Sequence, residues 1–289
     1  MGMSIHTNNT SLVTQNTLNS TNKMLGTAME RLGTGFRINS AADDAAGLQI
    51  AVRLQAQSNG QAVAMRNSQD AISMLQTGEG AFDEMTNILH RMKDLATQGA
   101  NGTNSTDDKA AMQSEYDQLG IELNNIMTNT TYAGDKLFDK VGSGGKFGPA
   151  AGVTFQIGST ATETLTVKVG TEITTVGTDI TAASASYGAP ATAGTEIGAA
   201  GTITLVNTAL ESLGTVRAKF GANINRLEHT INNLANMREN NEQAKGRIMD
   251  ADFAQEASNM SKNQMLMQSG MSVLSNANQM SGLVMSLLR

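Results

Sequence analysis

The stretch Leu75–Leu95, LQTGEGAFDEMTNILHRMKDL, decides the fold class because its large apolar side chains recur at helical spacing. The steps are of seven, three, four, three and three residues, at Leu75, Phe82, Met85, Leu89, Met92 and Leu95. One apolar stripe with this period predicts an amphipathic helix, and a looser stripe upstream extends it over about 42–98. Gly78 and Gly80 lie within this helix, and each destabilises it by about 1 kcal/mol relative to alanine. We expect packing to override them.

The helical pattern continues on both sides of a different middle segment. The two prolines, Pro149 and Pro190, both lie in a Gly-, Ala-, Thr- and Ser-rich stretch at about 141–201. Proline disrupts helices, so the proline-free flanks are free to be helical. In the first flank, Ser105 or Thr106 is expected to cap a second helix near 106–128.

The middle segment contains one clear strand pattern. Two runs alternate apolar and polar residues on either side of a short Gly-containing loop, with the apolar positions Val153, Phe155, Ile157, Leu165, Val167 and Val169. Such a pair predicts a β-hairpin with one apolar face, and we expect the neighbouring helices to cover that face.

Both ends of the chain carry apolar stripes in a weakly charged, Asn-, Ser- and Thr-rich background. The stripes comprise Leu18, Leu25 and Leu32 at one end and Met267, Met271, Leu274, Val284 and Leu287 at the other. An amphipathic helix with an uncovered stripe needs a partner, and a solvated helix normally carries more charge. We therefore interpret the ends as segments that fold against other copies of the chain. The alternative is a coiled coil between the two ends of one molecule, and both can hold together.

Composition argues against several classes of function. The 289 residues include no Cys and carry a formal net charge of −6, without a Lys/Arg cluster. Disulfides and thiolate sites are thus excluded, and nucleic acid is a poor partner. No Sec-type signal peptide or membrane-spanning run is evident. The three His are far apart, Asp43-Asp44 and Asp250-Ala251-Asp252 fit helix capping better than catalysis, and we expect no cofactor, metal or catalytic site.

Residues 31–47, RLGTGFRINSAADDAAG, resemble the flagellin pattern RLSSGxRINSAxDDAAG. The matching positions include Arg31, Arg37, Ile38, Asn39, Asp43 and Asp44, whereas Gly33 replaces a Ser and is expected to loosen a turn there. Further similarities follow in the family's order: IHTN at 5–8, ANGTNS at 100–105, FQIG at 155–158, ETL at 163–165, ADFAQE at 251–256 and SLLR at 286–289.

The resemblance implies a mainly α fold: a long antiparallel helical coiled coil or rod from both chain ends, with a small β-hairpin region. It implies an inner-tube helix and connector over 1–42, and rod helices plus the hairpin over 43–175. A short variable loop over 176–200 would replace outer domains. A rod helix over 201–244 and a second inner-tube helix over 245–289 would complete the chain.

The implied function is that of a secreted structural subunit of the flagellar filament, exported unfolded through the flagellar type III apparatus. Implied partners are further copies of the chain, an export chaperone, hook-associated and cap proteins, and a vertebrate Toll-like receptor. The matching receptor positions are Arg91, Leu95 and Glu115. The main alternative is the hook–filament junction protein. A flagellin-like peptidase and a soluble coiled-coil adaptor fit less well, since the zinc motif and the charged ends they need are missing.

Overall fold

The computed structural model describes residues 8–139, 144–148, 151–190 and 192–287, with side chains described only as far as residue 279 in the last helix. The chain forms two compact units. The first unit ends at Ser58 and resumes at Glu239, and the second comprises Asn59–Arg238. The division falls within the helices α2 (Ala45–Gly99) and α6 (Thr202–Met249). At the N-terminal side the division, between residues 58 and 59, lies after the expected boundary between residues 42 and 43. At the C-terminal side the division, between residues 238 and 239, lies before the expected boundary between residues 244 and 245.

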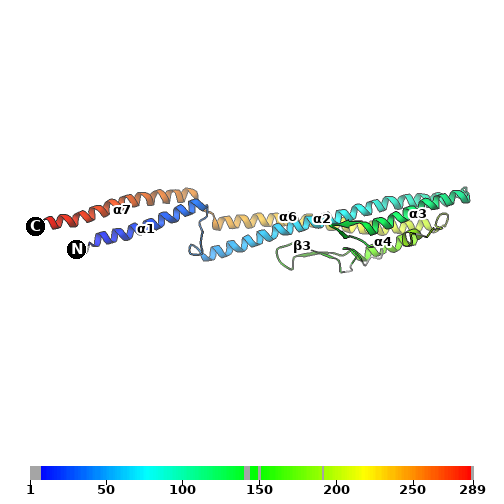
Figure 1. Cartoon of the computed structure of the whole chain (residues 1–289), viewed down its shortest axis with the longest axis horizontal. Coiled ribbons are helices and arrows are strands. Elements are labelled where there is room, and N and C mark those ends of the chain that lie inside the picture. The colour runs from blue at the N-terminus through cyan, green and yellow to red at the C-terminus, as the bar shows by residue number, and fades with distance from the viewer. Residues whose placement is uncertain (1–7, 140–143, 149–150, 191, 288–289) are drawn as a thin grey trace. The chain divides into compact units, whose positions relative to one another are not determined.

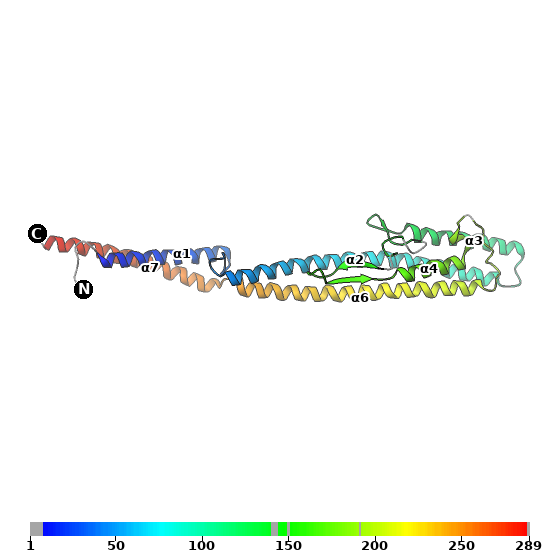
Figure 2. The same cartoon turned by 90° about the horizontal axis from the view of Figure 1, so that it is seen from below.

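The first unit contains an antiparallel helix pair made from the two ends of the chain (Figures 1 and 2). Helix α1 spans Asn9–Thr34 and helix α7 spans Phe253–Leu287. The Asn8 side chain donates to the Ala277 carbonyl near one end of the pair, and Arg31 binds Glu256 near the other. This pair confirms the expected coiled coil from both chain ends.

The second unit contains one apolar core that four helices share. Helices α3 (Thr106–Asn129) and α4 (Gly170–Ala183) lie along the second-unit parts of α2 and α6 (Figures 1 and 2). Ser105 caps α3 in a capping box with Asp108, as its sequence predicts. The rings of Phe82, Phe138, Phe147 and Phe220 meet in the core at centroid distances of 4.6–6.0 Å. The mainly helical fold is therefore confirmed.

The expected hairpin is present, next to a smaller one formed by β1 (Thr131–Tyr132) and β2 (Asp135–Lys136). Strand β3 (Val153–Gln156) pairs antiparallel with β4 (Thr164–Val167), so that Phe155 lies opposite Leu165. Leu165 and Val167 are buried in the helical core. The apolar face of the hairpin therefore covers the helices, which was the expectation.

The segment at 176–200, expected as a short variable loop, is folded in the residues described. It includes the end of α4 and the short helix α5 (Ala185–Gly188). Apolar residues of the segment, at Val176, Ile180, Ala183 and Tyr187, continue the helical spacing that begins at Ile173 of α4, and all five are fully buried. The loop after α5 is held to α3, because the Asp117 carboxylate accepts from the Gly194 N–H and the Ser186 hydroxyl. The Thr- and Ala-rich composition concealed a helix with a regular apolar face.

Helix α2 runs uninterrupted through Gly78 and Gly80, as expected, but the two glycines differ in their surroundings. A Cβ on Gly78 would lie 2.8 Å from the Phe220 ring and 3.0 Å from the Phe138 ring. Nothing lies within 4 Å of the same position on exposed Gly80. Gly78 is therefore required by packing, whereas Gly80 only weakens the helix.

We expect the two glycine-to-alanine substitutions to change stability in opposite directions. Gly80→Ala should raise the free energy of unfolding by about 0.5–1 kcal/mol through helix propensity. Gly78→Ala gains the same propensity but crowds two packed rings, a cost of typically 1–3 kcal/mol, so we expect net destabilisation. Urea unfolding followed by circular dichroism measures both. Equal stabilisation by the two changes would contradict the packing explanation.

Candidate self-assembly site

The seam between α1 and α7 follows a seven-residue repeat. In each helix the positions facing the partner step alternately by three and four residues, which is the pattern of a left-handed coiled coil. From α1 these are Ser11, Thr14, Leu18, Thr21, Leu25, Ala28 and Leu32, and from α7 Glu256, Met260, Asn263, Met267, Gly270, Leu274 and Ala277. All of them are buried or half-buried. The two ends of the chain thus form a specific pair.

About half of the seam is polar or small. Thr21 is 3% exposed and its hydroxyl donates to the Thr17 carbonyl, while the Ser11 hydroxyl donates to the Asn278 side chain at 3.1 Å. A Cβ on Gly270 would lie 2.7 Å from a Leu18 methyl group, so glycine allows the helices to approach closely there. Polar seam positions specify register at a cost in stability. The pair therefore buries little apolar area inside one molecule.

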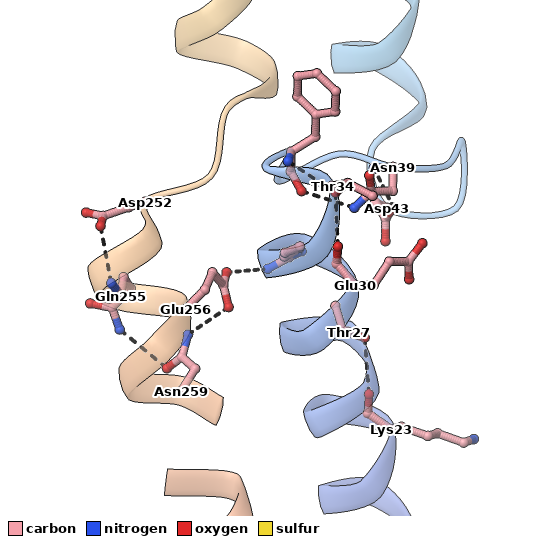
Figure 3. A network of polar contacts seen from close by, with 12 residues as sticks. Lys23, Thr27, Glu30, Thr34, Asn39, Asp43, Asp252, Gln255, Glu256 and Asn259 are labelled. Atoms are coloured by element: carbon pink, nitrogen blue, oxygen red, sulfur yellow. Dashed lines mark hydrogen bonds and ion pairs between the residues drawn. The ribbon is translucent and has the colours of Figure 1, made fainter. Parts of the chain in front are cut away.

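One ion pair crosses the seam. Arg31 Nη1 lies 3.0 Å from Glu256 Oε1, and both side chains are largely buried. On the same turn of α7, the Asn259 amide donates to the other Glu256 oxygen (Figure 3). Asp252 accepts from the Ala254 and Gln255 N–H groups and caps the start of α7. Capping was the interpretation of this acidic residue from sequence.

The motif residues 35–47 form a hydrogen-bonded connector between α1 and α2. Gly35 adopts φ +77° and ends α1. Asp43 Oδ2 accepts from the Ser40 N–H at 2.8 Å, from the Asn39 N–H at 3.1 Å and from the Ser40 hydroxyl. These bonds hold the pKa of Asp43 below its ordinary value. Asp44 accepts from the Gly47 N–H and so caps α2, as its position before a helix suggested.

Two further motif residues attach the connector to the neighbouring helix end. Ile38 is 2% exposed, and a Cβ on Gly47 would lie 2.8 Å from its terminal methyl. The Arg37 guanidinium donates to the Ile248 carbonyl and its N–H to the Met249 carbonyl, at the end of α6. Gly33, expected to loosen a turn, lies inside α1 with nothing near its missing side chain. Helix α1 therefore accommodates the departure from the motif without a change of path.

The predicted assembly residues divide into two groups. Leu25 is buried, and Leu18, Leu32, Met267 and Leu274 are half-buried, all in the seam of their own molecule. Met271 is 54% exposed and lies outside the seam. The side chains of Val284 and Leu287 lie outside the described residues. Most of the predicted stripe thus pairs the two ends of one molecule, which was the alternative left open by the sequence.

A second apolar set on the pair points to solvent. Its residues lie on several sides of the two helices, and we call them together the outer face: Leu12, Val13, Met24, Met29, Met265, Leu266, Met271 and Val273, each 46–64% exposed. So many large apolar side chains on one helix pair are typical of an interaction surface. Of these residues, Met271 alone was predicted from the sequence as an assembly residue. The missed signal was the apolar residues interleaved with the heptad, such as Val13 and Leu266.

The predicted receptor positions lie in the second unit. Arg91 and Glu115 form a surface ion pair at 2.7 Å, with about half of each side chain exposed. Leu95 is 2% exposed and belongs to the apolar core. The structure thus brings Arg91 and Glu115 together at the surface and places Leu95 beneath it. In the part of the chain that is described, no cluster of His, Asp and Glu suits a metal ion, and no helix has the length and apolarity to cross a membrane.

Two family models match most of the chain. Residues 5–143 match the bacterial flagellin N-terminal helical region, and residues 203–288 match the C-terminal helical region. The chain belongs to the bacterial flagellin family. Flagellin A of Vibrio anguillarum is 35% identical over 379 aligned residues, and polar flagellin F of Vibrio parahaemolyticus is 34% identical over 378, each with full coverage of both chains. This flagellin is therefore a structural subunit that self-assembles into the bacterial flagellar filament.

Solved structures include similar chains. The crystal structure of Bacillus cereus flagellin is 33% identical, covers 58% of this chain and 88% of its own, and superposes with a TM-score of 0.47. A putative flagellar hook-associated protein from Vibrio parahaemolyticus is 17% identical, covers 72% of this chain and 97% of its own, and gives a TM-score of 0.42. Both scores are below 0.5, so the family assignment rests on the sequence matches. Between the two matched regions, residues 144–202 match neither family model.

We expect Arg31→Gln to loosen the helix pair far more than the same change at a surface ion pair. Removing Arg31 leaves the Glu256 carboxylate largely buried without its cation, at a cost of about 1–3 kcal/mol. Arg91→Gln breaks an exposed pair worth about 0.2–1 kcal/mol. Hydrogen–deuterium exchange of the α1 and α7 amides in assembled filaments measures the first effect. Unchanged exchange in the Arg31→Gln filaments would show that the ion pair does not hold the helices together.

Proposed function

We propose that the outer face of the α1–α7 pair is the surface through which this flagellin contacts other copies in the filament. The supporting observation is the exposure of eight large apolar side chains on a helix pair whose own seam is about half polar or small. Burying each such side chain is worth about 1.5–3 kcal/mol, so three or four of them contribute several kcal/mol per contact. Contacts repeated by a non-closing helical operator produce a filament.

In this proposal the seam residues act indirectly. Leu18, Leu25, Leu32, Met267 and Leu274 hold α1 against α7, and the pair then presents its outer face. Val284 and Leu287 continue the apolar pattern toward the end of the chain. A seam this polar stabilises an isolated pair weakly, so ordering of the ends is coupled to assembly. Apolar contacts in the seam thus order the helix pair, and apolar contacts of the outer face with other copies stabilise that ordered pair.

The remaining partners and the route to the filament are proposals that rest on family membership. We infer that the chain is exported unfolded through the flagellar type III apparatus into the extracellular flagellum. An export chaperone would cover the apolar terminal segment before export, and hook-associated and cap proteins would meet the same surfaces at the filament ends. As a member of a structural family, the chain is inferred to have no enzymatic activity and to need no cofactor.

Replacing outer-face residues should prevent filament formation. Leu266→Ser combined with Met271→Ser removes two exposed apolar side chains and should raise the free-subunit concentration needed for filaments by about 100-fold or more, from the same burial energies. Gln264→Ser with Gln268→Ser is the matched control on exposed polar positions of α7. Sedimentation and negative-stain electron microscopy after seeding measure both. Filaments from both double variants at the wild-type concentration would exclude the outer face as the assembly surface.

Recognition by a vertebrate Toll-like receptor is proposed through Arg91 and Glu115. Their surface ion pair lies on adjacent helices and is accessible in the monomer, whereas Leu95 supports the helix from within the core. An Arg91→Ala monomer should activate the receptor at least about tenfold less well, because truncating an arginine anchor typically costs more than 1 kcal/mol. A reporter-cell assay measures activation, with Arg66→Ala, another exposed arginine of α2, as the control. Equal activation by the two variants would exclude Arg91 as a contact.

A further inference from the structure

The helices α1 and α7 carry few charges, and those few are unevenly paired. Five charged side chains occur in the two helices: Lys23, Glu30 and Arg31 in α1, and Glu256 and Lys262 in α7. Arg31 and Glu256 bind each other across the seam. The charged groups of Lys23, Glu30 and Lys262 are exposed and have no hydrogen bond or ion pair among the described residues. Each copy therefore has two cationic side chains, Lys23 and Lys262, and one acidic side chain, Glu30, without an ionic partner among the described residues.

The two lysines lie on one groove of the helix pair. This groove, which we call the basic groove, has a volume of about 380 Å³, and its charged lining residues are Lys23, Arg31, Lys262 and Glu256. Its charge is therefore positive in a chain whose net charge is −6. The lining also includes the buried Asn263, and the Arg31 Nε–H lacks an acceptor among the described residues. Such a lining attracts a carboxylate.

Glu30 is the unpaired acid of the helix pair, and it does not line the basic groove of its own molecule. In Figure 3 the Glu30 carboxylate and the Lys23 ammonium both point away from α7. Lys23 is a lining residue of the groove, and its long flexible side chain allows the ammonium to turn toward a carboxylate bound there. When copies pack together, this part of the helix pair loses water, and a buried carboxylate without a cation is costly. An acid on one patch and a basic groove on another are complementary surfaces of the kind that a non-closing contact requires.

We propose that the basic groove of one copy receives the Glu30 carboxylate of a second copy, between Lys23 and Lys262. This pairing rests on the proposed function of the helix pair as the contact between copies. It adds a directional element to the apolar outer face, because charge complementarity fixes register and suppresses wrong alignments. Each copy then supplies one acid and one groove.

Charge reversal on either side of the contact tests the pairing. Glu30→Lys places a cation opposite the two lysines of the next copy. The double change Lys23→Glu with Lys262→Glu places two acids around Glu30. We expect each chain alone to need a free-subunit concentration at least about tenfold above that of the wild type, since like charges in a desolvated contact are strongly unfavourable. Glu228→Lys, an exposed acid of α6 with the same change in net charge, should assemble like the wild type.

Mixing the two charge-reversed chains in equal amounts separates a contact between copies from a fault within one chain. In the mixture, Lys at position 30 of one chain meets the acidic groove of the other, and Glu30 of the second chain meets the basic groove of the first. We expect filaments from the mixture near the wild-type concentration, seen by sedimentation and electron microscopy. No recovery on mixing, or wild-type assembly by either reversed chain alone, would overturn the pairing. Failure of the wild-type chain itself to form filaments would instead count against the proposed function.

Discussion

The polar seam between α1 and α7 is the constraint on which the first unit depends. A coiled coil of this length normally buries branched aliphatic residues at most of its inward positions. Here Thr21, Asn263 and Gly270 occupy such positions, and among the described side chains Leu25, at 8% exposure, is the one leucine of the seam that is buried and not half-buried. Register is well specified, but the apolar area buried inside one molecule is small. The remaining apolar side chains of the pair therefore need to be covered by something outside it.

The second unit covers its apolar side chains with other parts of the same chain. Its core joins apolar residues from α2, α3, α4, α6 and the β3–β4 hairpin, and four phenylalanine rings meet at its centre. Arg217 of α6 also forms an ion pair with Asp83 of α2, with 2.9 Å between Arg217 Nη2 and Asp83 Oδ1. A unit that buries its own apolar side chains is stable alone, whereas one that exposes them gains stability by mass action when copies bind. The division of the chain into two units thus separates a part that buries most of its large apolar side chains from a part that leaves many of them exposed.

Sequence periodicity predicted the long helices and the hairpin, because regular apolar spacing follows directly from the geometry of each element. It did not identify α4, whose apolar face is as regular but lies among threonines and alanines that suggested a loop. It predicted contacts between copies for Leu18 and Leu274 and left open a pairing of the two chain ends within one molecule, and in the structure both leucines lie in that pairing. A stripe at helical spacing shows that a face is buried but not what buries it. The outer face was overlooked because its residues fall between the heptad positions.

The motif at 31–47 could be recognised from sequence because several of its side chains bond to backbone or fill one fixed space. Asp43 accepts from N–H groups within the connector, Asp44 from an N–H at the start of α2, Arg37 donates to carbonyls at the end of α6, and Ile38 is buried. Such contacts tolerate few other residue types, because a short acceptor that caps backbone N–H groups or a long donor that reaches a carbonyl is needed at one fixed place. Gly33 departs from the pattern at an exposed helical position where no contact depends on it. The connector is therefore specified residue by residue, while the helices it joins are specified only by a repeating pattern, and it is the residue-specific part that carries the family identity.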